Sequence, residues 1–200
     1  PCEGITKVTL EDVAYAAKFG SVIKLLGMTS KAENGVYAMV CPAMISETNP
    51  LGGIDDVFNG IMVRGDGLGD VMFYGRGAGA LPTASAVLSD IIDTVKHKDK
   101  HIRLGWSEGE EGYLLDSKTL PARFYARLHG ENANSSARQK LANKGYDIIT
   151  LEGDKYKDEF AVITPEMSEY DFEKLLQGSE LSEYEVLGKM RLVAEYMVKV

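Results

Sequence analysis

The stretch FYGRGAGALPTASAV, residues 73–87, carries the most specific chemical signal in the sequence. Glycines at positions 75, 77 and 79 follow an apolar run and precede a helical pattern, so backbone there is free to approach a ligand. The spacing from Gly75 to Ala80 even satisfies the loose dinucleotide fingerprint. That fingerprint belongs to a βαβ unit with an acidic residue roughly 20 residues on, whereas this helix leads into a charged stretch without a strand. A Rossmann loop is not favoured, and the residues leave a structural turn and a ligand-binding loop equally open.

The histidines offer weaker chemistry. His97 and His101 have the spacing of two metal ligands on one helix face, but no Cys or third His accompanies them and lysines interleave. We interpret both as solvated residues, and His129 as a structural residue at a strand end. Lys24, within an apolar strand pattern, is interpreted as an edge lysine whose charged end reaches water.

No residue qualifies as a catalytic acid, base or nucleophile, because neither a Ser-His-Asp nor a Cys-His arrangement can be assembled from the sequence. No metal site is predicted. The acidic cluster Glu108, Glu110 and Glu111 is interpreted as a solvated loop. Two cysteines, Cys2 and Cys41, do not make a disulfide framework, which fits a reducing, cytoplasmic location.

Composition limits the partners. The chain has 200 residues, 44% hydrophobic and 26% charged, which allows one or two globular domains. Its formal net charge of −8 argues against nucleic acid or an anionic membrane surface as the main partner. No apolar run approaches the ~20 residues of a membrane span. The chain opens with PCEGITKV rather than Met, and we expect it to be a fragment of a longer protein.

The first half of the chain alternates helix and strand patterns. Thr9 and Asp12 have capping-box spacing, and apolar residues then recur at helical spacing up to Gly20. The clearest helix follows the glycine-rich stretch, with Pro82 in its first turn. Its apolar face comprises Ala84, Val87, Leu88, Ile91, Ile92 and Val95. Strands are expected over 21–28, which should be buried, over 35–46, and as a hairpin over 58–65 and 70–75.

A charged, glycine-rich stretch separates a second unit. We assign residues 1–104 to a first domain, 105–121 to a linker and 122–200 to a second domain. In the second domain, strand patterns cover 122–130, 146–153, 159–165 and 183–194, and helical patterns cover 135–145 and 169–178. The order β-α-β-β-α-β is ferredoxin-like. The predicted fold class is therefore α+β with α/β character: a mixed sheet with helices, followed by a ferredoxin-like unit.

The sequence strongly resembles the C-terminal portion of homoserine dehydrogenases. The resemblance rests on EGITKVTLEDVAYAAKFGSVIKLLG (3–27), on NPLGGIDDVFNGIMVRGDGLGDVMFYGRGAGALPTASAVLSDIID (49–93) and on RLG (103–105). The later βαββαβ unit looks like the ACT regulatory domain that many members carry. The resemblance implies that residues 1–104 are the C-terminal part of a catalytic domain, and that residues 122–200 are an ACT-like domain.

The family interconverts L-homoserine and L-aspartate 4-semialdehyde, with hydride transfer to or from NAD or NADP, in threonine, methionine and isoleucine biosynthesis. The resemblance places the loop GRGAG beside the nicotinamide, and implies cofactor contacts for Gly77 first, then Gly75, Ala78 and Gly79. The family's dinucleotide-binding fingerprint, its catalytic lysine and its substrate-binding acidic residues precede the EGI motif. The resemblance therefore implies a fragment that is inactive by itself, from an enzyme expected to be a homodimer.

The ACT-like unit departs from the family pattern at its first turn. Ligand-binding members have an Asp-x-Pro-Gly-like turn there, whereas this sequence reads GENANSSAR (130–138). Asn132 and Asn134 are candidate contacts for an amino-acid effector, but we favour the alternative that they cap the helix. In a second interpretation the chain is an amino-acid-sensing or dimerisation module without catalysis. The sequence does not choose between NAD and NADP, because that choice lies in the domain it lacks.

Overall fold

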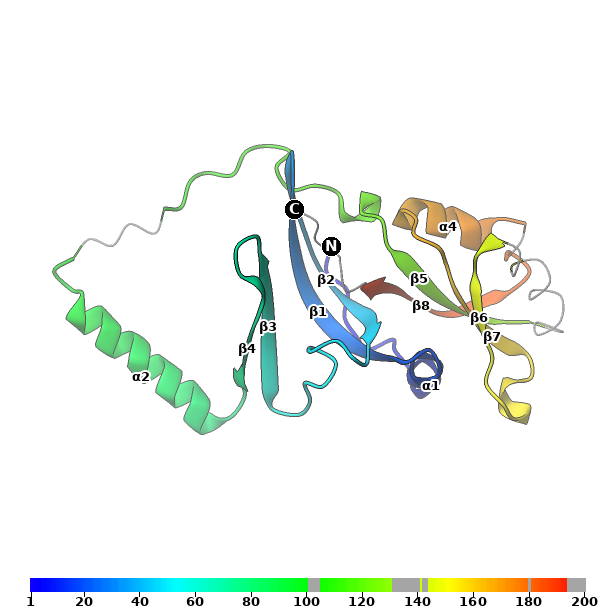
Figure 1. The fold of residues 1–200 in the computed structure, drawn as a ribbon, viewed down its shortest axis with the longest axis horizontal. Helices are drawn as coiled ribbons and strands as arrows, with labels where there is room; N and C mark the ends of the chain where they lie inside the picture. The colour runs from blue at the N-terminus through cyan, green and yellow to red at the C-terminus, as the bar shows by residue number, and fades with distance from the viewer. Residues whose placement is uncertain (101–104, 131–140, 142–143, 180, 194–200) are drawn as a thin grey trace. The chain divides into compact units, whose positions relative to one another are not determined.

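The computed structural model describes residues 1–100, 105–130, 141, 144–179 and 181–193 (Figure 1). The chain divides into two compact units. The first unit joins Pro1–Gly52 to the chain from Gly112 onward, and the second unit is Gly53–Glu111. These units are cut differently from the domains expected at 1–104 and 122–200, which stay a prediction.

The first unit is built on a mixed six-stranded sheet with the order β1-β2-β8-β5-β7-β6. β2 and β8 are parallel, and all the other neighbours are antiparallel. The strands are β1 (Ser21–Ala32), β2 (Gly35–Ser46), β5 (Arg123–His129), β6 (Asp147–Ile149), β7 (Glu159–Ile163) and β8 (Glu185–Val193). The predicted mixed sheet is confirmed, and it contains strands from both ends of the chain.

Helices cover both faces of this sheet. Alternate residues of a strand point to opposite faces, and β7 shows this directly. Phe160 and Val162 pack with Phe172 of α4 (Glu169–Gln177) in one core cluster. Ala161 and Ile163 pack with Tyr15 and Ala16 of α1 (Leu10–Lys18) in the other cluster. Strands buried on both faces read as continuous apolar runs, as EFAVI does.

The sequence signals at the helix ends are confirmed. Thr9 and Asp12 form a reciprocal capping box at the start of α1, and Gly20 follows its end with φ +66°. Ser168 caps α4 by accepting a hydrogen bond from the Asp171 backbone N–H at 3.1 Å. The helix expected at 135–145 falls almost wholly outside the described residues.

Two segments of the first unit differ from expectation. β1 was expected to be a buried strand of 21–28, but it continues to Ala32 because it pairs with β2 along its whole length. As the edge strand it is only half covered, and Leu25 is 48% exposed. The end of the expected linker is also ordered against the sheet. Val36 donates to the Tyr113 carbonyl at 2.8 Å, and a 3-10 turn, η1, spans Ser117–Thr119.

The second unit contains the hairpin of β3 (Phe58–Gly65) and β4 (Gly69–Arg76), followed by α2 (Ala80–Lys96). The predicted hairpin is confirmed, and its strands pair from Phe58↔Arg76 to Gly65↔Gly69. Among its described residues, none is buried. Two strands and one helix offer too little surface to enclose a core of their own.

Candidate functional site

The glycine loop, defined here as residues 75–79, connects β4 to α2 and includes the last residues of the strand. Gly79 is the N-cap residue of α2 and has φ +115° and ψ +153°, a conformation that residues with a Cβ rarely adopt. Its carbonyl accepts hydrogen bonds from the backbone N–H and the hydroxyl of Thr83, at 3.2 and 2.8 Å. Gly79 therefore has a structural reason to be glycine.

Gly77 and Gly75 differ in what surrounds them. A Cβ added to Gly77 would lie 1.9 Å from the side-chain amide nitrogen of Asn59, and the Gly77 N–H donates to the Val57 carbonyl at 3.2 Å. A side chain at position 77 would therefore force the exposed Asn59 side chain to move. At Gly75 an added Cβ would meet nothing within 4 Å, so the described structure gives no packing reason for glycine there.

The start of α2 beside the loop is open and electropositive. Its N-cap residue makes no side-chain cap, and its first turn contains no acidic residue. The backbone N–H groups of a helix's first turn carry partial positive charge and need acceptors from outside the helix. Beside the loop, the Phe58 and Tyr74 rings stack 4.9 Å apart, and the Arg76 guanidinium lies 5.1 Å from the Phe58 centroid. The loop therefore combines accessible backbone, an uncapped helix end and a nearby cation.

His97, the other candidate residue described in this unit, does not form a catalytic cluster with the loop. His97 is the C-cap residue at the opposite end of α2, where its Nδ1 lies 3.0 Å from the Asp93 carbonyl oxygen. His101, Asn132 and Asn134 lie outside the described residues. Within the described ranges, no three His, Cys, Asp or Glu side chains gather as a metal site requires. In the same ranges, no helix combines the length and hydrophobicity needed to cross a lipid bilayer.

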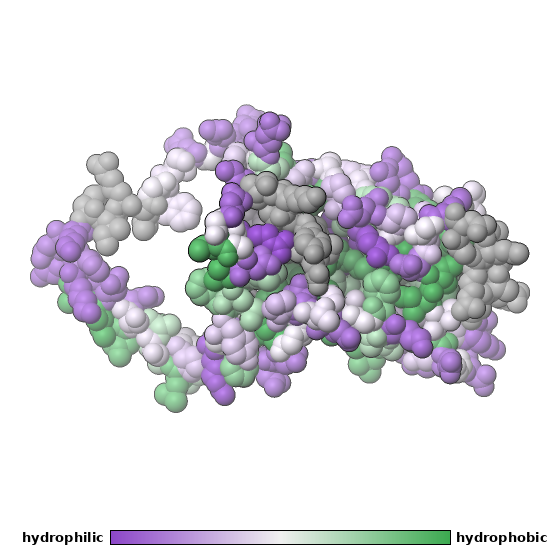
Figure 2. All heavy atoms as spheres, viewed as in Figure 1, coloured by the Kyte–Doolittle hydropathy of each residue, from purple (hydrophilic) through white to green (hydrophobic). Residues whose placement is uncertain are grey.

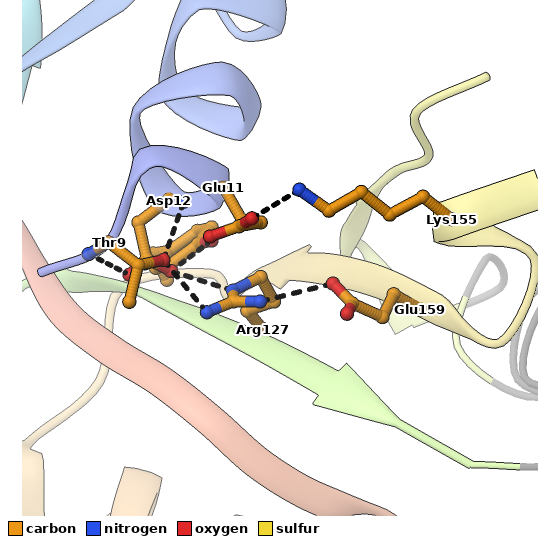
Figure 3. A network of polar contacts seen from close by, with 7 residues as sticks. Thr9, Glu11, Asp12, Arg127, Lys155 and Glu159 are labelled. Carbon is orange, nitrogen blue, oxygen red and sulfur yellow. Dashed lines mark hydrogen bonds and ion pairs between the residues drawn. The ribbon is translucent and has the colours of Figure 1, made fainter. Parts of the chain in front are cut away.

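A buried polar network in the first unit was not predicted as such (Figure 3). Asp12, 1% exposed, accepts hydrogen bonds at Oδ1 from the Tyr125 hydroxyl at 3.0 Å and from Arg127 Nε at 2.8 Å. Its Oδ2 accepts from the backbone N–H and hydroxyl of Thr9, at 2.9 and 3.1 Å. Arg127 also donates to Glu159 Oε2 at 3.1 Å. The network fastens α1 to β5 and β7.

The charges in this network stabilise one another. Burial alone would lower the pKa of Arg127, but its hydrogen bonds and ion pairs with Asp12 and Glu159 leave that pKa raised. Burial, together with the Asp12 carboxylate, raises the pKa of Tyr125, because both disfavour a phenolate. At the solvent side, a hydrogen bond from Lys155 lowers the pKa of Glu11 to about 2. These shifts favour the charged guanidinium of Arg127, the neutral phenol of Tyr125 and the ionised carboxylate of Glu11, which suits a structural role.

The sequence could signal only part of this network. The capping box identified Thr9 and Asp12 as a helix start, and both do cap α1. Arg127, however, stands in a strand pattern 115 residues away from Asp12, and nothing local shows that the two meet. The one signal for a partner was the position of Arg127 in an alternating apolar strand pattern, because charged residues are rarely buried without a partner.

The glycine loop lies within a stretch of sequence that matches a known protein family. Residues 1–92, which include the whole loop, match the family model described as homoserine dehydrogenase. These residues belong to the homoserine dehydrogenase family. A homoserine dehydrogenase from Neisseria gonorrhoeae is 33% identical over 157 residues, covering 75% of this chain and 36% of that protein. One from Bacillus subtilis is 26% identical over 203 residues, covering 94% of this chain and 46% of that protein.

Solved homoserine dehydrogenase structures share the fold. The structure of the Thiobacillus denitrificans enzyme aligns with a TM-score of 0.67 at 27% identity, covering 95% of this chain and 46% of that chain. A Staphylococcus aureus structure at pH 6.5 aligns with a TM-score of 0.69 at 26% identity, covering 96% and 46%. The chain therefore spans less than half the length of the homoserine dehydrogenases it is compared with.

Proposed function

We propose that the chain is part of a homoserine dehydrogenase that interconverts L-homoserine and L-aspartate 4-semialdehyde with NAD or NADP. The family match over residues 1–92 carries this proposal. No residue of this chain is proposed as the acid or base, so the proton transfer that accompanies hydride transfer is assigned to a part of the protein outside this chain. We infer that the 200-residue chain alone does not turn over homoserine.

The glycine loop is proposed to contact the cofactor with backbone rather than with side chains. Gly75 is open to a ligand, and the uncapped start of α2 offers N–H donors to an acceptor group. The nicotinamide, when bound, supplies the hydride chemistry, and this loop would form a wall against which the ring is oriented. Gly77, Ala78 and Gly79 would shape that wall, because the Gly77 hydrogen bond to Val57 and the cap geometry of Gly79 hold the loop backbone.

An assay of the full-length protein tests this assignment. Gly75→Leu adds bulk without a collision inside the described structure, so we expect KM for the nicotinamide cofactor to rise about tenfold or more through crowding. Gly67→Leu in the β3–β4 turn is the matched control, because nothing lies within 4 Å of its Cβ either. Unchanged KM in Gly75→Leu would remove the loop from the cofactor site. Turnover by the 200-residue chain would show that the chemistry lies within it.

Residues 122–200 are proposed to form an ACT-like regulatory unit. The strand order β8-β5-β7-β6, with every neighbour antiparallel and α4 between β7 and β8, supports a βαββαβ arrangement. The helix that would complete it corresponds to 135–145, which lies almost wholly outside the described residues. This order favours the second candidate function, an amino-acid-sensing or association module, as a role of this unit within the enzyme.

The homodimer is part of the same proposal. Light scattering during gel filtration of the 200-residue chain tests it, with a mass twice 21.9 kDa expected. If the 200-residue chain stays monomeric at every concentration tested, any dimer contacts are assigned to the rest of the full-length protein.

A further inference from the structure

Arg76 is the only charged residue of the glycine loop, and it contacts an aromatic pair on the same hairpin. Phe58 is opposite Arg76 in the register of β3 and β4, and Tyr74 precedes Arg76 by two positions, so the three side chains share one face. The residue opposite Tyr74 is Gly60, which has no side chain to separate the Tyr74 ring from Phe58. The two rings stack with their planes 8° apart, and the guanidinium lies over the Phe58 ring. Cation–π attraction therefore gives the guanidinium a preferred position on this face.

In the described part of the chain, the N–H groups of Arg76 have no hydrogen-bond or ion-pair partner. A guanidinium that lies over a ring keeps its N–H donors for other groups. Arg76 differs in this from the four other arginines in the described ranges, each of which donates to a carboxylate. These pairs are Arg64 with Asp70, Arg123 with Asp147, Arg127 with Asp12 and Arg191 with Glu169.

The chemistry of the free guanidinium suits an anionic ligand. Its planar fork of donors matches two oxygens of a carboxylate or of a phosphate. The proposed reactants offer both groups, because homoserine and aspartate semialdehyde each carry a carboxylate and the nicotinamide dinucleotide carries phosphates. The first turn of α2 contains no acidic residue that could compete, and the Arg64–Asp70 pair lies at the opposite end of the hairpin.

The face on which Arg76 lies restricts the part of a reactant that it can bind. Neighbouring residues of a strand point to opposite faces, so Arg76 and Gly75 lie on different faces of the hairpin. A nicotinamide ring placed against Gly75 would therefore leave the guanidinium to a charged group elsewhere on the cofactor or on the substrate.

We propose that Arg76 binds an anionic oxygen pair of the reactants, either the substrate carboxylate or a cofactor phosphate. This inference rests on the proposed dehydrogenase function, and it adds one charged side chain to the backbone contacts proposed for the loop. Phe58 and Tyr74 act as positioning residues. They hold the guanidinium in place before the ligand arrives, which reduces the side-chain entropy lost on binding.

Steady-state kinetics of the full-length protein test the inference. Arg76→Gln removes the charge and should raise KM for one reactant about tenfold to a hundredfold. We expect kcat to stay within about twofold of the parent value, because the contact is present in the bound substrate and in the transition state alike. A rise in KM for homoserine identifies the carboxylate as the partner, and a rise in KM for the cofactor identifies the phosphate. Arg76→Lys keeps the charge without the planar fork and should give an intermediate rise in the same KM.

Two further variants separate binding from structure. Arg64→Gln removes an arginine from the same face at the other end of the hairpin, and it should leave both KM values unchanged. Phe58→Leu removes the ring beneath the guanidinium and should raise the same KM as Arg76→Gln, by about twofold to fivefold. Added salt should raise this KM in the parent more than in Arg76→Gln, because salt screens the attraction between exposed charges.

The possible outcomes distinguish this inference from the proposed function. If both KM values of Arg76→Gln stay within about twofold of the parent values, Arg76 does not bind a reactant. An equal change in Arg64→Gln, or a loss of kcat with both KM values altered, would also overturn the inference, because either would indicate a disturbed hairpin. Absence of homoserine turnover by the full-length parent would contradict the proposed function as well, whereas turnover with unaffected KM values would contradict the role of Arg76 alone.

Discussion

β7 in the first unit and α2 in the second are both rich in apolar side chains, but their surroundings are opposite. Every residue of β7 after Glu159 is buried, between α1 on one face and α4 on the other. None of the residues of α2 is buried, and Leu88 and Ile91 are 57% and 55% exposed. Figure 2 shows hydrophobic residues in green along one side of this helix.

The difference shows that an amphipathic pattern specifies a helix without supplying its partner. α2 has a capped C-terminus and a continuous apolar stripe, and these suffice to predict it from sequence. The free energy of burial is gained only when another surface covers the stripe. α2 gains little of this free energy in the structure, since none of its residues is buried.

Hydrogen exchange should give the largest contrast between the units. Amides of β5 and β7 should exchange only through global opening, whereas those of α2 and of the β3–β4 hairpin should exchange through local opening. We expect protection factors in the 200-residue chain to differ by about a thousandfold or more. Mass spectrometry of deuterated peptides measures this, and equal protection in both units would contradict the comparison.

A pair of apolar truncations sharpens the same contrast. Phe160→Ala removes a fully buried ring from β7 and should lower the free energy of unfolding by about 3–5 kcal/mol. Ile91→Ala truncates the exposed face of α2 and should change it by less than about 0.5 kcal/mol in the 200-residue chain. Urea denaturation followed by circular dichroism measures both. A large loss from Ile91→Ala would mean that the stripe is already covered in solution.

The buried network allows a similar comparison within the first unit. Asp12→Ala leaves Arg127 buried without its main partner and removes the Asp12 half of the capping box, so we expect a loss of about 3–5 kcal/mol. Ser168→Ala removes the exposed cap of α4 and should cost only about 1 kcal/mol. Urea denaturation of the two variants measures the difference in their free energies of unfolding, provided that both unfold with the same m-value. Similar losses would show that burial adds nothing to the Asp12 contacts.

The smallest effect is expected at the exposed rim of the network. The pKa of Glu11 is lowered from 4.5 to about 2 by Lys155, so its contribution to folding is complete above pH 4.5 and is lost as the pH falls toward 2. We expect urea midpoints to decrease across this window, and less so in Glu11→Gln. Glu33→Gln, in the turn between β1 and β2, is the control. If the urea midpoints of the parent, Glu11→Gln and Glu33→Gln proteins change with pH in the same way, the ion pair of Glu11 with Lys155 does not contribute to stability.

Local signals predicted the elements better than their partners. Thr9, Gly20 and Ser168 marked helix ends correctly, because caps and turns depend on residues close in sequence. The hairpin of β3 and β4 was also predictable from its glycines. The extension of β1 to Ala32 was missed, since its polar outer half gains its hydrogen bonds only by pairing with β2.

The glycine loop was recognised from its residues, but the separate reasons for its glycines were not. Gly77 faces Asn59 of β3, Gly79 adopts a positive φ, and Gly75 faces open space. Sequence spacing cannot distinguish these cases, because two of them depend on contacts or conformations formed after the hairpin closes. The structure thereby identifies Gly75 as the position where a ligand contact can be tested without damage to packing.

By itself the sequence determined the helix starts, the hairpin, the apolar runs and a resemblance to homoserine dehydrogenases. Only the tertiary structure placed β2 beside β8 and buried Asp12 against Arg127. The physical reason is the separation in sequence between the residues that interact. Capping and periodicity act within a few residues, whereas strand order and burial arise when segments more than a hundred residues apart compete for the same sheet edge and the same apolar cover.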